Sequence, residues 1–376
     1  MLKAGWQTKK FSDVLDIRNG RNQKAVESES GTYPVLGSAG NVMGYATDYI
    51  CEAGTTIIGR KGNISTPIYV ETKFWNVDTA FGLSPKAGLN NKFLYYYCLS
   101  YDFAALNRGT TIPSLVKSEL LEISIPLPPL PEQTRIVAIL DEAFANISQA
   151  VANAEKNLAN TRELFDSYLN KVFASSDERV KLSEITTVIS DGDHSPPPKA
   201  QEGIPFITIS NVNKNTRLID FSDTFKVPQS YFDALKDTRK PFFGDVLYTV
   251  TGSYGIPIKV PHGVEFCFQR HIGLLRPKKN INSSWLYYAL LSPSVYEQAS
   301  SGATGTAQKT VSLNVLRNIE VPMMSESEQV SAVEKLDLFW AQKEELEDIY
   351  RRKLAALAEL KQALLQKAFT GELTAN

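Results

Sequence analysis

The sequence predicts an α+β protein of tandem design, in which two β-rich domains are each followed by one long helix. Three observations support this fold class. Sequence segments recur in an unchanged order, short β-branched and aromatic runs fill two globular regions, and a long helical pattern follows each region. We therefore predict four parts along the 376 residues, with ranges 1–126 (first domain), 127–176 (first helix), 177–322 (second domain) and 323–376 (second helix).

An internal repeat relates the two halves of the chain. Four matches carry it: Phe93-Leu-Tyr-Tyr96 with Trp285-Leu-Tyr-Tyr288, Gly109-Thr110 with Gly305-Thr306, Glu132-Gln133 with Glu328-Gln329, and Lys171-x-Phe173 with Lys367-x-Phe369. The first pair is 192 residues apart and the other three are 196 apart, whereas Lys10-Phe11 returns after only 171 residues as Lys181-Leu182. The separation grows in the globular region and is constant in the helix, because loops accept insertions and a packed helix does not.

The globular regions are predicted to be mainly β-sheet. Their short runs of β-branched and aromatic residues are bounded by Gly, Pro and Asn, as is typical of strands. The clearest runs are 55–58, 67–70, 205–209, 245–250 and 320–321. One short helix is expected in each domain, at 92–100 and at 284–291.

The first long helix has a regular apolar seam. From Pro131, which suits the first helical turn, the seam advances by alternating steps of three and four residues, as in a coiled coil. It consists of Val137, Leu140, Phe144, Ile147, Val151, Ala154, Leu158, Thr161, Phe165, Tyr168 and Val172. Since an apolar stripe cannot stay exposed, this helix needs a partner.

The second long helix is the expected partner. Its predicted seam is Leu336, Trp340, Leu346, Ile349, Leu354, Leu357, Leu360 and Leu364, with Lys343 and Glu347 at the positions equivalent to Ile147 and Val151. We expect the two helices to form an antiparallel coiled coil, with one domain near each end. The alternative is that each helix packs back on its own domain, and periodicity alone does not decide between them.

Composition excludes several classes of protein. The chain has a formal net charge of −1, is 43% hydrophobic and contains no apolar run of the length that spans a bilayer. The N-terminal residues contain no apolar signal segment, and the three cysteines are far apart, so we expect a cytoplasmic protein with reduced thiols. The three histidines fit no metal-site pattern.

The charge is distributed unevenly. Residues 1–125 carry +2 and residues 180–322 carry +3, whereas 126–179 and 323–376 carry −3 each. Mildly basic domains on acidic helices suit a protein that touches a polyanion through its domains.

The junctions between domain and helix carry a family resemblance. The first reads Ile123-Ser-Ile-Pro-Leu-Pro-Pro-Leu-Pro-Glu-Gln-Thr-Arg-Ile-Val137, and a degenerate copy follows at Ile319-Glu-Val-Pro-Met-Met-Ser-Glu-Ser-Glu-Gln-Val330. Together with Gly109-Thr-Thr111, Leu169-x-Lys-x-Phe173 and the segment 364–373, these junctions closely resemble the specificity (S) subunit of type I restriction-modification enzymes. The resemblance covers essentially the whole chain, but Met323-Met-Ser325 departs from the proline-rich pattern.

The resemblance implies two target-recognition domains, each reading one half of a bipartite site in double-stranded DNA. It implies that the helices set the half-site spacing and dock two modification (methyltransferase) subunits, with restriction/translocase subunits joining for cleavage. S-adenosylmethionine, Mg and ATP would then belong to those partners, with no cofactor in this chain.

The residues themselves give no sign of an enzyme. The sequence has no Gly-rich cofactor loop, no Asn/Asp-Pro-Pro-aromatic motif and no phosphate-binding loop of the G-x-x-x-x-G-K-[ST] type. The cluster Asp191-Gly-Asp-His194 has the composition of an acid/base site, but Asp and Gly in such a cluster more often form a turn. We expect neither a catalytic nor a metal site.

Polar and basic residues on matched loops are the candidate DNA contacts. Arg and Lys can pair with guanine and Asn or Gln with adenine, at about 1–3 kcal/mol per good bidentate contact. In the first domain the candidates are Arg60, Lys61 and Asn63, then Arg108, Thr110 and Thr111, and finally Arg18 and Arg21. In the second domain they are Thr249, Thr251, Ser253 and Tyr254, then Gln308 and Lys309, and finally Asn213 and Lys214. Each could equally be an ordinary turn residue.

One other function fits the same architecture. Tandem β domains on a coiled coil also suit a non-catalytic adaptor that binds protein or glycan partners and no DNA. Salt-dependent DNA binding separates the two readings, because phosphate contacts release counterions.

Overall fold

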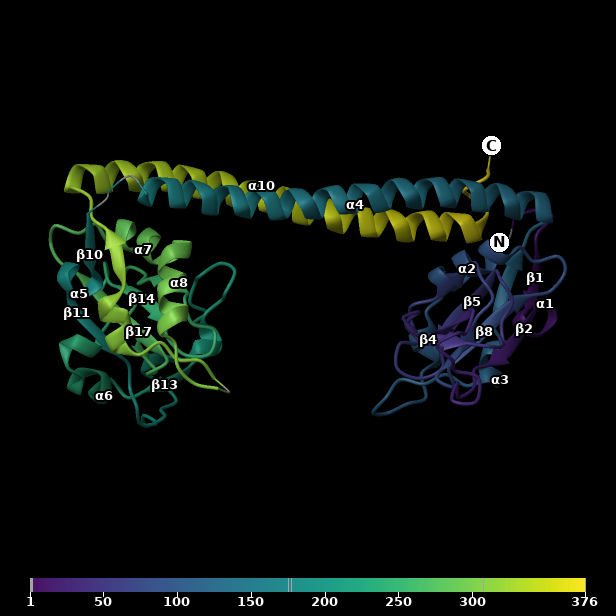
Figure 1. Cartoon of the computed structure of the whole chain (residues 1–376), viewed down its shortest axis with the longest axis horizontal. Helices are drawn as coiled ribbons and strands as arrows, with labels where there is room; N and C mark the ends of the chain where they lie inside the picture. Colours follow the sequence, from purple (N-terminus) through teal and green to yellow (C-terminus); the bar gives the residue numbers. More distant parts are fainter. Residues whose placement is uncertain (1–2, 175, 177, 307, 376) are drawn as a thin grey trace. The chain divides into compact units, whose positions relative to one another are not determined.

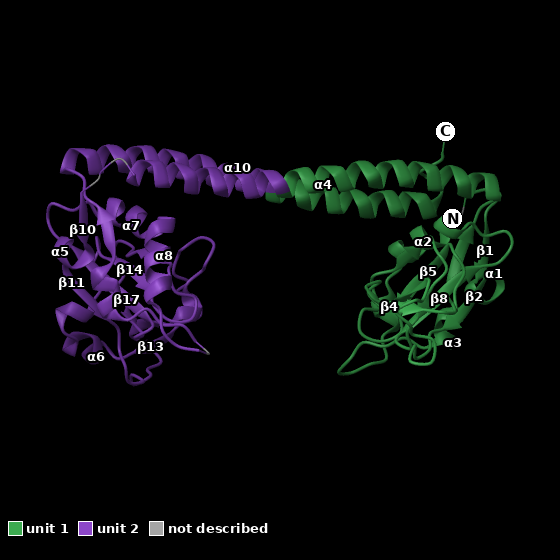
Figure 2. Cartoon of the chain, viewed as in Figure 1, with its two compact units in different colours: residues 1–155, 351–376 green, residues 156–350 purple. Residues whose placement is uncertain are grey.

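The computed structural model describes residues 3–174, 176, 178–306 and 308–375. The chain forms two compact units, of which unit 1 is Met1–Glu155 with Arg351–Asn376 and unit 2 is Lys156–Tyr350 (Figure 2). Two long helices, α4 (Leu130–Phe173) and α10 (Glu326–Thr370), are divided between the units, so that each unit contains one segment of each helix. Among the described residues, no helix is long and apolar enough to cross a membrane.

Unit 1 is built on two small sheets and a separate strand pair. A four-stranded antiparallel sheet has the order β2 (Leu15–Asn19), β8 (Ala80–Pro85), β5 (Thr55–Gly59), β6 (Ile68–Val70). A three-stranded sheet has the order β4 (Val42–Ala46), β3 (Tyr33–Leu36), β7 (Trp75–Asn76), and β1 (Gln7–Lys10) pairs with β9 (Ser124–Leu127). All five residues of β5 are buried, which explains its run of Thr and Ile without polar alternation.

Short helices complete unit 1: α1 (Phe11–Val14), α2 (Asn91–Ser100), a 3-10 turn at Phe103–Leu106 and α3 (Lys117–Leu121). The predicted helix at 92–100 is confirmed as α2, which Asn90 caps by accepting a hydrogen bond from the Phe93 amide. Phe93 is fully buried and packs edge-on against Phe369 of α10, so this helix joins the sheet to the long helices.

Unit 2 repeats this arrangement. Its four-stranded sheet has the order β11 (Thr186–Asp191), β17 (Ile272–Pro277), β14 (Val246–Thr249), β15 (Pro257–Lys259). The three-stranded sheet is β13 (Phe225–Val227), β12 (Ile204–Ile207), β16 (Cys267–Phe268), and β10 (Arg179–Lys181) pairs with β18 (Glu320–Pro322). The shared strand order confirms the predicted tandem repeat.

The helices of unit 2 are more numerous in the described part of the chain. They are α5 (Leu182–Ile185), α6 (Gln229–Ala234), α7 (Ser283–Leu291), α8 (Pro293–Gly302) and α9 (Leu313–Asn318), with 3-10 turns at Ile209–Asn211 and Asp237–Arg239. The predicted helix at 284–291 is confirmed as α7. The added segments 209–211, α6 and 237–239 lie before α7, where the repeat separation grows from 171 to 192 residues, and α8 follows α7, where it grows to 196.

The long helices pack antiparallel within each unit (Figure 1). In unit 1 the beginning of α4 lies beside the end of α10, and the Lys361 ammonium sits 5.0 Å from the centre of the Phe144 ring. In unit 2 the end of α4 lies beside the beginning of α10, with Phe165 edge-on to Trp340 at 5.1 Å. All eleven predicted seam residues of α4 are buried or half-buried, which confirms that seam.

The predicted seam of α10 is wrong in its middle part. Leu346 and Ile349 are 41% and 43% exposed, and Leu360 is 47% exposed. Glu347 lies on the seam, at the position that the repeat assigns to it, and is 3% exposed; Arg162 and Lys343 both donate hydrogen bonds to its Oε1, each over 3.0 Å. A carboxylate with two cationic partners can be buried, so the apolar residues turn outward.

This buried ionic cluster predicts a pH dependence of stability. Burial raises the pKa of Glu347, but hydrogen bonds from Lys343 and Arg162 outweigh burial, so the pKa lies below its ordinary 4.5. A carboxyl group with a lowered folded-state pKa stabilises the fold fully above the ordinary value and loses this effect as pH falls through the folded value.

We therefore expect Glu347→Gln to lower the melting temperature at neutral pH, with the difference from wild type shrinking below about pH 4. Thermal unfolding followed across this range tests the expectation. Glu359→Gln, at an exposed position of the same helix, serves as the control and should match wild type throughout. A constant difference between wild type and Glu347→Gln at all pH values would contradict it.

Candidate nucleic-acid interface

In unit 1, three chain segments meet at one end of the four-stranded sheet. Strands β2 and β5 both run antiparallel to the central strand β8. Asn19 at the end of β2 pairs with Phe81, and Gly59 at the end of β5 pairs with Ala80, where β8 begins. The loops that follow β2 and β5 and the turn that precedes β8 are therefore neighbours, although they are far apart in the sequence.

The loop at 107–115 joins the same end of the sheet. The Gly62 amide donates to the Pro113 carbonyl over 2.9 Å, and the Leu115 amide donates to the Arg60 carbonyl over 2.9 Å. Gly59 has no room for a side chain, since a Cβ there would lie 1.9 Å from the Asn63 carbonyl oxygen. The structure thus brings together two of the predicted loops. One carries Arg60, Lys61 and Asn63, and the other carries Arg108, Thr110 and Thr111.

The predicted basic residues of unit 1 differ in their availability. Lys61 and Arg21 are exposed, and their side chains form no hydrogen bond or ion pair with the described residues. Arg60 is also exposed but reaches the Asp78 carbonyl at 3.4 Å. Two others are engaged: Arg108 makes two hydrogen bonds to Glu119 Oε1, at 2.6 and 2.9 Å, and Arg18 donates to the Ile50 carbonyl.

The remaining predicted residues of unit 1 are polar groups on these loops. Thr110 and Thr111 are exposed at the tip of the 107–115 loop, and Asn63 is half-buried in the loop that follows β5. Asn107 closes that loop, because its Oδ1 accepts from the amides of Gly109 and Ser114 at 2.8 and 2.9 Å. These hydrogen bonds hold the two ends of the loop together and leave its tip exposed.

Unit 2 has the same junction of loops. Asp191 at the end of β11 pairs with Gly273, and Thr249 at the end of β14 pairs with Ile272, where β17 begins. The Gly252 amide donates to the Lys309 carbonyl over 3.0 Å, as Gly62 does to Pro113 in unit 1. The predicted residues Thr251, Gln308 and Lys309 are brought together here, but Thr251 is only 8% exposed, whereas Gln308 and Lys309 are exposed.

The prediction that Thr249 contacts DNA is wrong. Thr249 is completely buried; its hydroxyl donates to the Ser253 carbonyl over 2.8 Å and accepts from the Ile256 amide over 3.0 Å. It therefore closes the turn after β14 and offers no surface to DNA. Tyr254 also faces the protein, since its ring stacks on Tyr296 and its hydroxyl donates to Ser300 Oγ.

The structure does not bring Asn213 and Lys214 to this end of the sheet. They lie on a hairpin closed by the Asn213 amide, which donates to the Leu218 carbonyl over 3.0 Å. The same hairpin places the Arg217 guanidinium 5.2 Å from the Trp340 ring centre, so it reaches α10. Asn213 acts as a turn former, with its Oδ1 accepting from the amides of Asn215 and Thr216.

Sequence reasoning missed the turns that precede the central strands. These turns carry Asp78 and Thr79 before β8 and Arg270 and His271 before β17. In unit 2 the turn lines a cavity of 330 Å³ together with both predicted loops. The repeat separation of 192 residues places the two turns in register, and this was the available signal.

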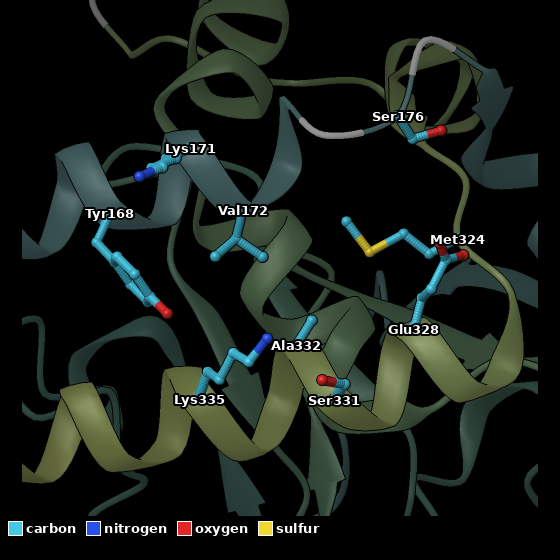
Figure 3. A pocket seen from close by; sticks show the side chains of 9 residues that line it. All are labelled: Tyr168, Lys171, Val172, Ser176, Met324, Glu328, Ser331, Ala332 and Lys335. Carbon is cyan, nitrogen blue, oxygen red and sulfur yellow. The ribbon is translucent and has the colours of Figure 1, made fainter.

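A different cavity lies where the end of α4 meets the beginning of α10 in unit 2 (Figure 3). Its volume is 640 Å³, and Lys171, Lys335 and Glu328 are among its lining residues. None of the predicted contact residues lines it. It belongs to the helix junction and not to the loop-bearing end of the sheet.

The acidic cluster in the second unit is structural. His194 Nε2 lies 2.7 Å from an Asp191 carboxylate oxygen, while Asp193 accepts from Tyr231 and contacts Arg239 at 3.4 Å. Among the described residues, no group of three or more His, Cys, Asp or Glu side chains could hold a metal ion.

The three cysteines, Cys51, Cys98 and Cys267, are buried free thiols, and burial raises the pKa of Cys51 and of Cys267 to about 12.

Comparison with known proteins identifies the family. A family model for the type I restriction modification DNA specificity domain matches residues 3–156 and again residues 178–353, once on each half of the repeat. The chain belongs to the family of type I restriction-modification specificity subunits. It is thus a DNA sequence-specificity subunit, as its junction motifs predict, and the adaptor alternative is not favoured.

Curated relatives and solved structures agree with this assignment. The specificity subunit of the Escherichia coli enzyme EcoBI is 24% identical, with 85% of this chain and 73% of that protein covered. The MjaVIII specificity subunit of Methanocaldococcus jannaschii is 22% identical over 98% of this chain and 93% of that protein.

Two solved structures share the fold of this specificity subunit. A chain from a structure of type I R-M complex assembly matches with a TM-score of 0.77 at 21% identity, covering 99% of this chain and 100% of that chain. The HsdS subunit from Thermoanaerobacter tengcongensis gives a TM-score of 0.58 at 21% identity, with 99% and 98% covered.

Proposed function

We propose that each unit of this specificity subunit reads one half of a bipartite DNA site, through the loops gathered at the end of its four-stranded sheet. The observation that carries this proposal is the repeated junction of loops with different side chains. Arg60 and Lys61 of unit 1 correspond to Val250 and Thr251 of unit 2, at a repeat separation of 190 residues. The two units hold their loops in the same backbone arrangement but present different hydrogen-bonding side chains. This combination suits domains that recognise different DNA sequences.

In this proposal the chain carries out no reaction itself. Two modification subunits bind it and supply S-adenosylmethionine, while restriction/translocase subunits bring Mg and ATP for cleavage. The outward apolar residues of α10 support docking of a partner helix. In unit 2 they include Leu338, Leu346 and Ile349, whose spacing of eight and three residues puts them on one face.

Electrophoretic shifts of the co-expressed complex with its modification subunits test the proposal. Binding to a DNA fragment that contains the target should weaken steeply as salt is raised, because phosphate contacts release counterions. The isolated chain should bind far more weakly, since its domains carry only +2 and +3. An affinity for DNA that depends neither on the salt concentration nor on the DNA sequence would contradict the proposal.

The long helices are proposed to set the distance between the half-sites. Deleting seven residues from α4 and the seven facing residues of α10 preserves the seam and removes about 10 Å of helix. We expect the preferred spacer to shorten by at most about 3 base pairs, at about 3.4 Å each. Methylation of a series of sites that differ only in spacer length measures this, and an active variant with an unchanged preference would refute it.

A further inference from the structure

The turn before the central strand differs in charge between the two units. Unit 1 has Asp78 and Thr79 there, directly before β8, and unit 2 has Arg270 and His271, directly before β17. The neighbouring loop has the opposite distribution: Arg60 and Lys61 in unit 1 correspond to the uncharged Val250 and Thr251 in unit 2. The positive charge thus lies on the loop after β5 in unit 1, but on the turn before β17 in unit 2.

Backbone hydrogen bonds fix the Arg270 turn among the loops of unit 2. The Val250 amide donates to the His271 carbonyl over 2.9 Å, and the Arg270 amide donates to the Asp193 carbonyl over 3.1 Å. Arg270 and His271 line the 330 Å³ cavity together with Thr251 and Gln308 from the two predicted loops. Arg270 therefore lies between these loops and not at their periphery.

The Arg270 guanidinium is available for a ligand. It is exposed and forms no hydrogen bond or ion pair with the described residues. The acidic side chains nearest to the turn have other partners, because Asp191 is paired with His194, and Asp193 with Tyr231 and Arg239. The Arg270 guanidinium therefore has no ion-pair partner among the described residues.

Arg270 is thus an exposed cation among the loops of unit 2 that the loop motifs did not contain. We propose that Arg270 reads a guanine in the half-site bound by unit 2. Two guanidinium N–H groups match the O6 and N7 acceptors of guanine in the major groove, an arrangement that Val250 and Thr251 cannot supply. Asp78 at the matched position of unit 1 accepts hydrogen bonds and would repel these acceptors, so the two units read different bases.

The inference rests on the proposed division of the site between the units. It is tested with the co-expressed methyltransferase complex on a library of DNA sites randomised at each position, with the methylated members sequenced. Arg270→Ala and Arg270→Lys are compared with wild type. Lys279→Ala is the matched control, because it removes an exposed charge just beyond the opposite end of β17.

We expect Arg270→Ala to reduce discrimination for guanine at one position of one half-site by about 10-fold or more. The other half-site should be unchanged, Arg270→Lys should recover only part of the preference, and Lys279→Ala should equal wild type. A uniform loss at all sequences with a weaker salt dependence would mean a phosphate contact and overturn the inference, as would an unchanged motif. A wild-type complex without two half-sites would instead refute the proposed function.

Discussion

Replacing residues 1–122 with the corresponding segment of a relative of different specificity should change one half-site completely and leave the other intact. The reason is that the loops at the sheet end of unit 1 all belong to this segment, from the end of β2 to the 107–115 loop. The equivalent segments of unit 2, which carry Thr251, Arg270 and Gln308, all belong to residues 178–322. Sequencing of methylated DNA from the assembled complex gives both half-sites in one measurement.

The donor segment has to keep the contacts that join unit 1 to the long helices. Asp141 of α4 accepts from the Tyr96 hydroxyl and the Lys92 ammonium of α2, so the donor should retain both. The reciprocal transplant of residues 178–322 is the control and should change only the other half-site. If either transplant altered both half-sites, the units would not be independent readers.

Gln133→Leu should destabilise unit 1 by about 2–4 kcal/mol, since it leaves buried polar groups without partners. Gln133 is fully buried at the first turn of α4. Its Oε1 accepts from the Asn90 amide over 2.8 Å, and its Nε2 donates to the carbonyls of Gly88 and Pro128 over 2.9 and 2.8 Å. One side chain therefore connects the long helix, the proline-rich junction and the cap of α2.

Urea denaturation with a probe in unit 1 measures this cost. The control is Gln149→Leu on an exposed turn of the same helix, which should stay within about 0.5 kcal/mol of wild type. Gln329 repeats the arrangement in unit 2, where its Oε1 accepts from the Asn282 amide over 2.8 Å, so Gln329→Leu should destabilise that unit. A Gln133→Leu variant as stable as the control would show that these hydrogen bonds contribute little.

The junction motif explains why the family was recognisable from the sequence. The Glu-Gln pair at each junction is conserved between the two copies because Gln makes the same buried hydrogen bonds in both units. Glu132 also has a structural role: it accepts from the Lys3 ammonium over 2.8 Å, a hydrogen bond that lowers its pKa. The Glu-Gln pair could be recognised in the sequence because its contacts recur at the same position in both copies of the repeat.

Regular spacing predicted the α4 seam correctly, whereas in α10 hydrophobicity predicted the seam only in part. The predicted residues that are buried or half-buried are Leu336, Trp340, Leu354, Leu357 and Leu364. Glu347 occupies the seam only because Arg162 from the other helix and Lys343 neutralise it. Hydrophobicity therefore favoured Leu346 and Ile349, which face outward. Partners supplied by a distant segment are invisible to a periodicity argument.

The candidate interface was predictable only in part for the same reason. The loops carrying Lys61 and Lys309 were found because glycines and small residues mark them in the sequence. Arg270 was missed because its place depends on the pairing of β17 with β11 and β14. Asn213 has the composition of a contact loop, but its hairpin reaches α10.

Footprinting of the assembled complex on its target DNA tests the division of the site between the units most directly. We expect two protected base-specific segments, separated by a spacer in which bases can be exchanged freely. Arg270→Ala should weaken base-specific protection in one segment only. A single continuous stretch of base-specific protection would show that the two units do not read separate half-sites.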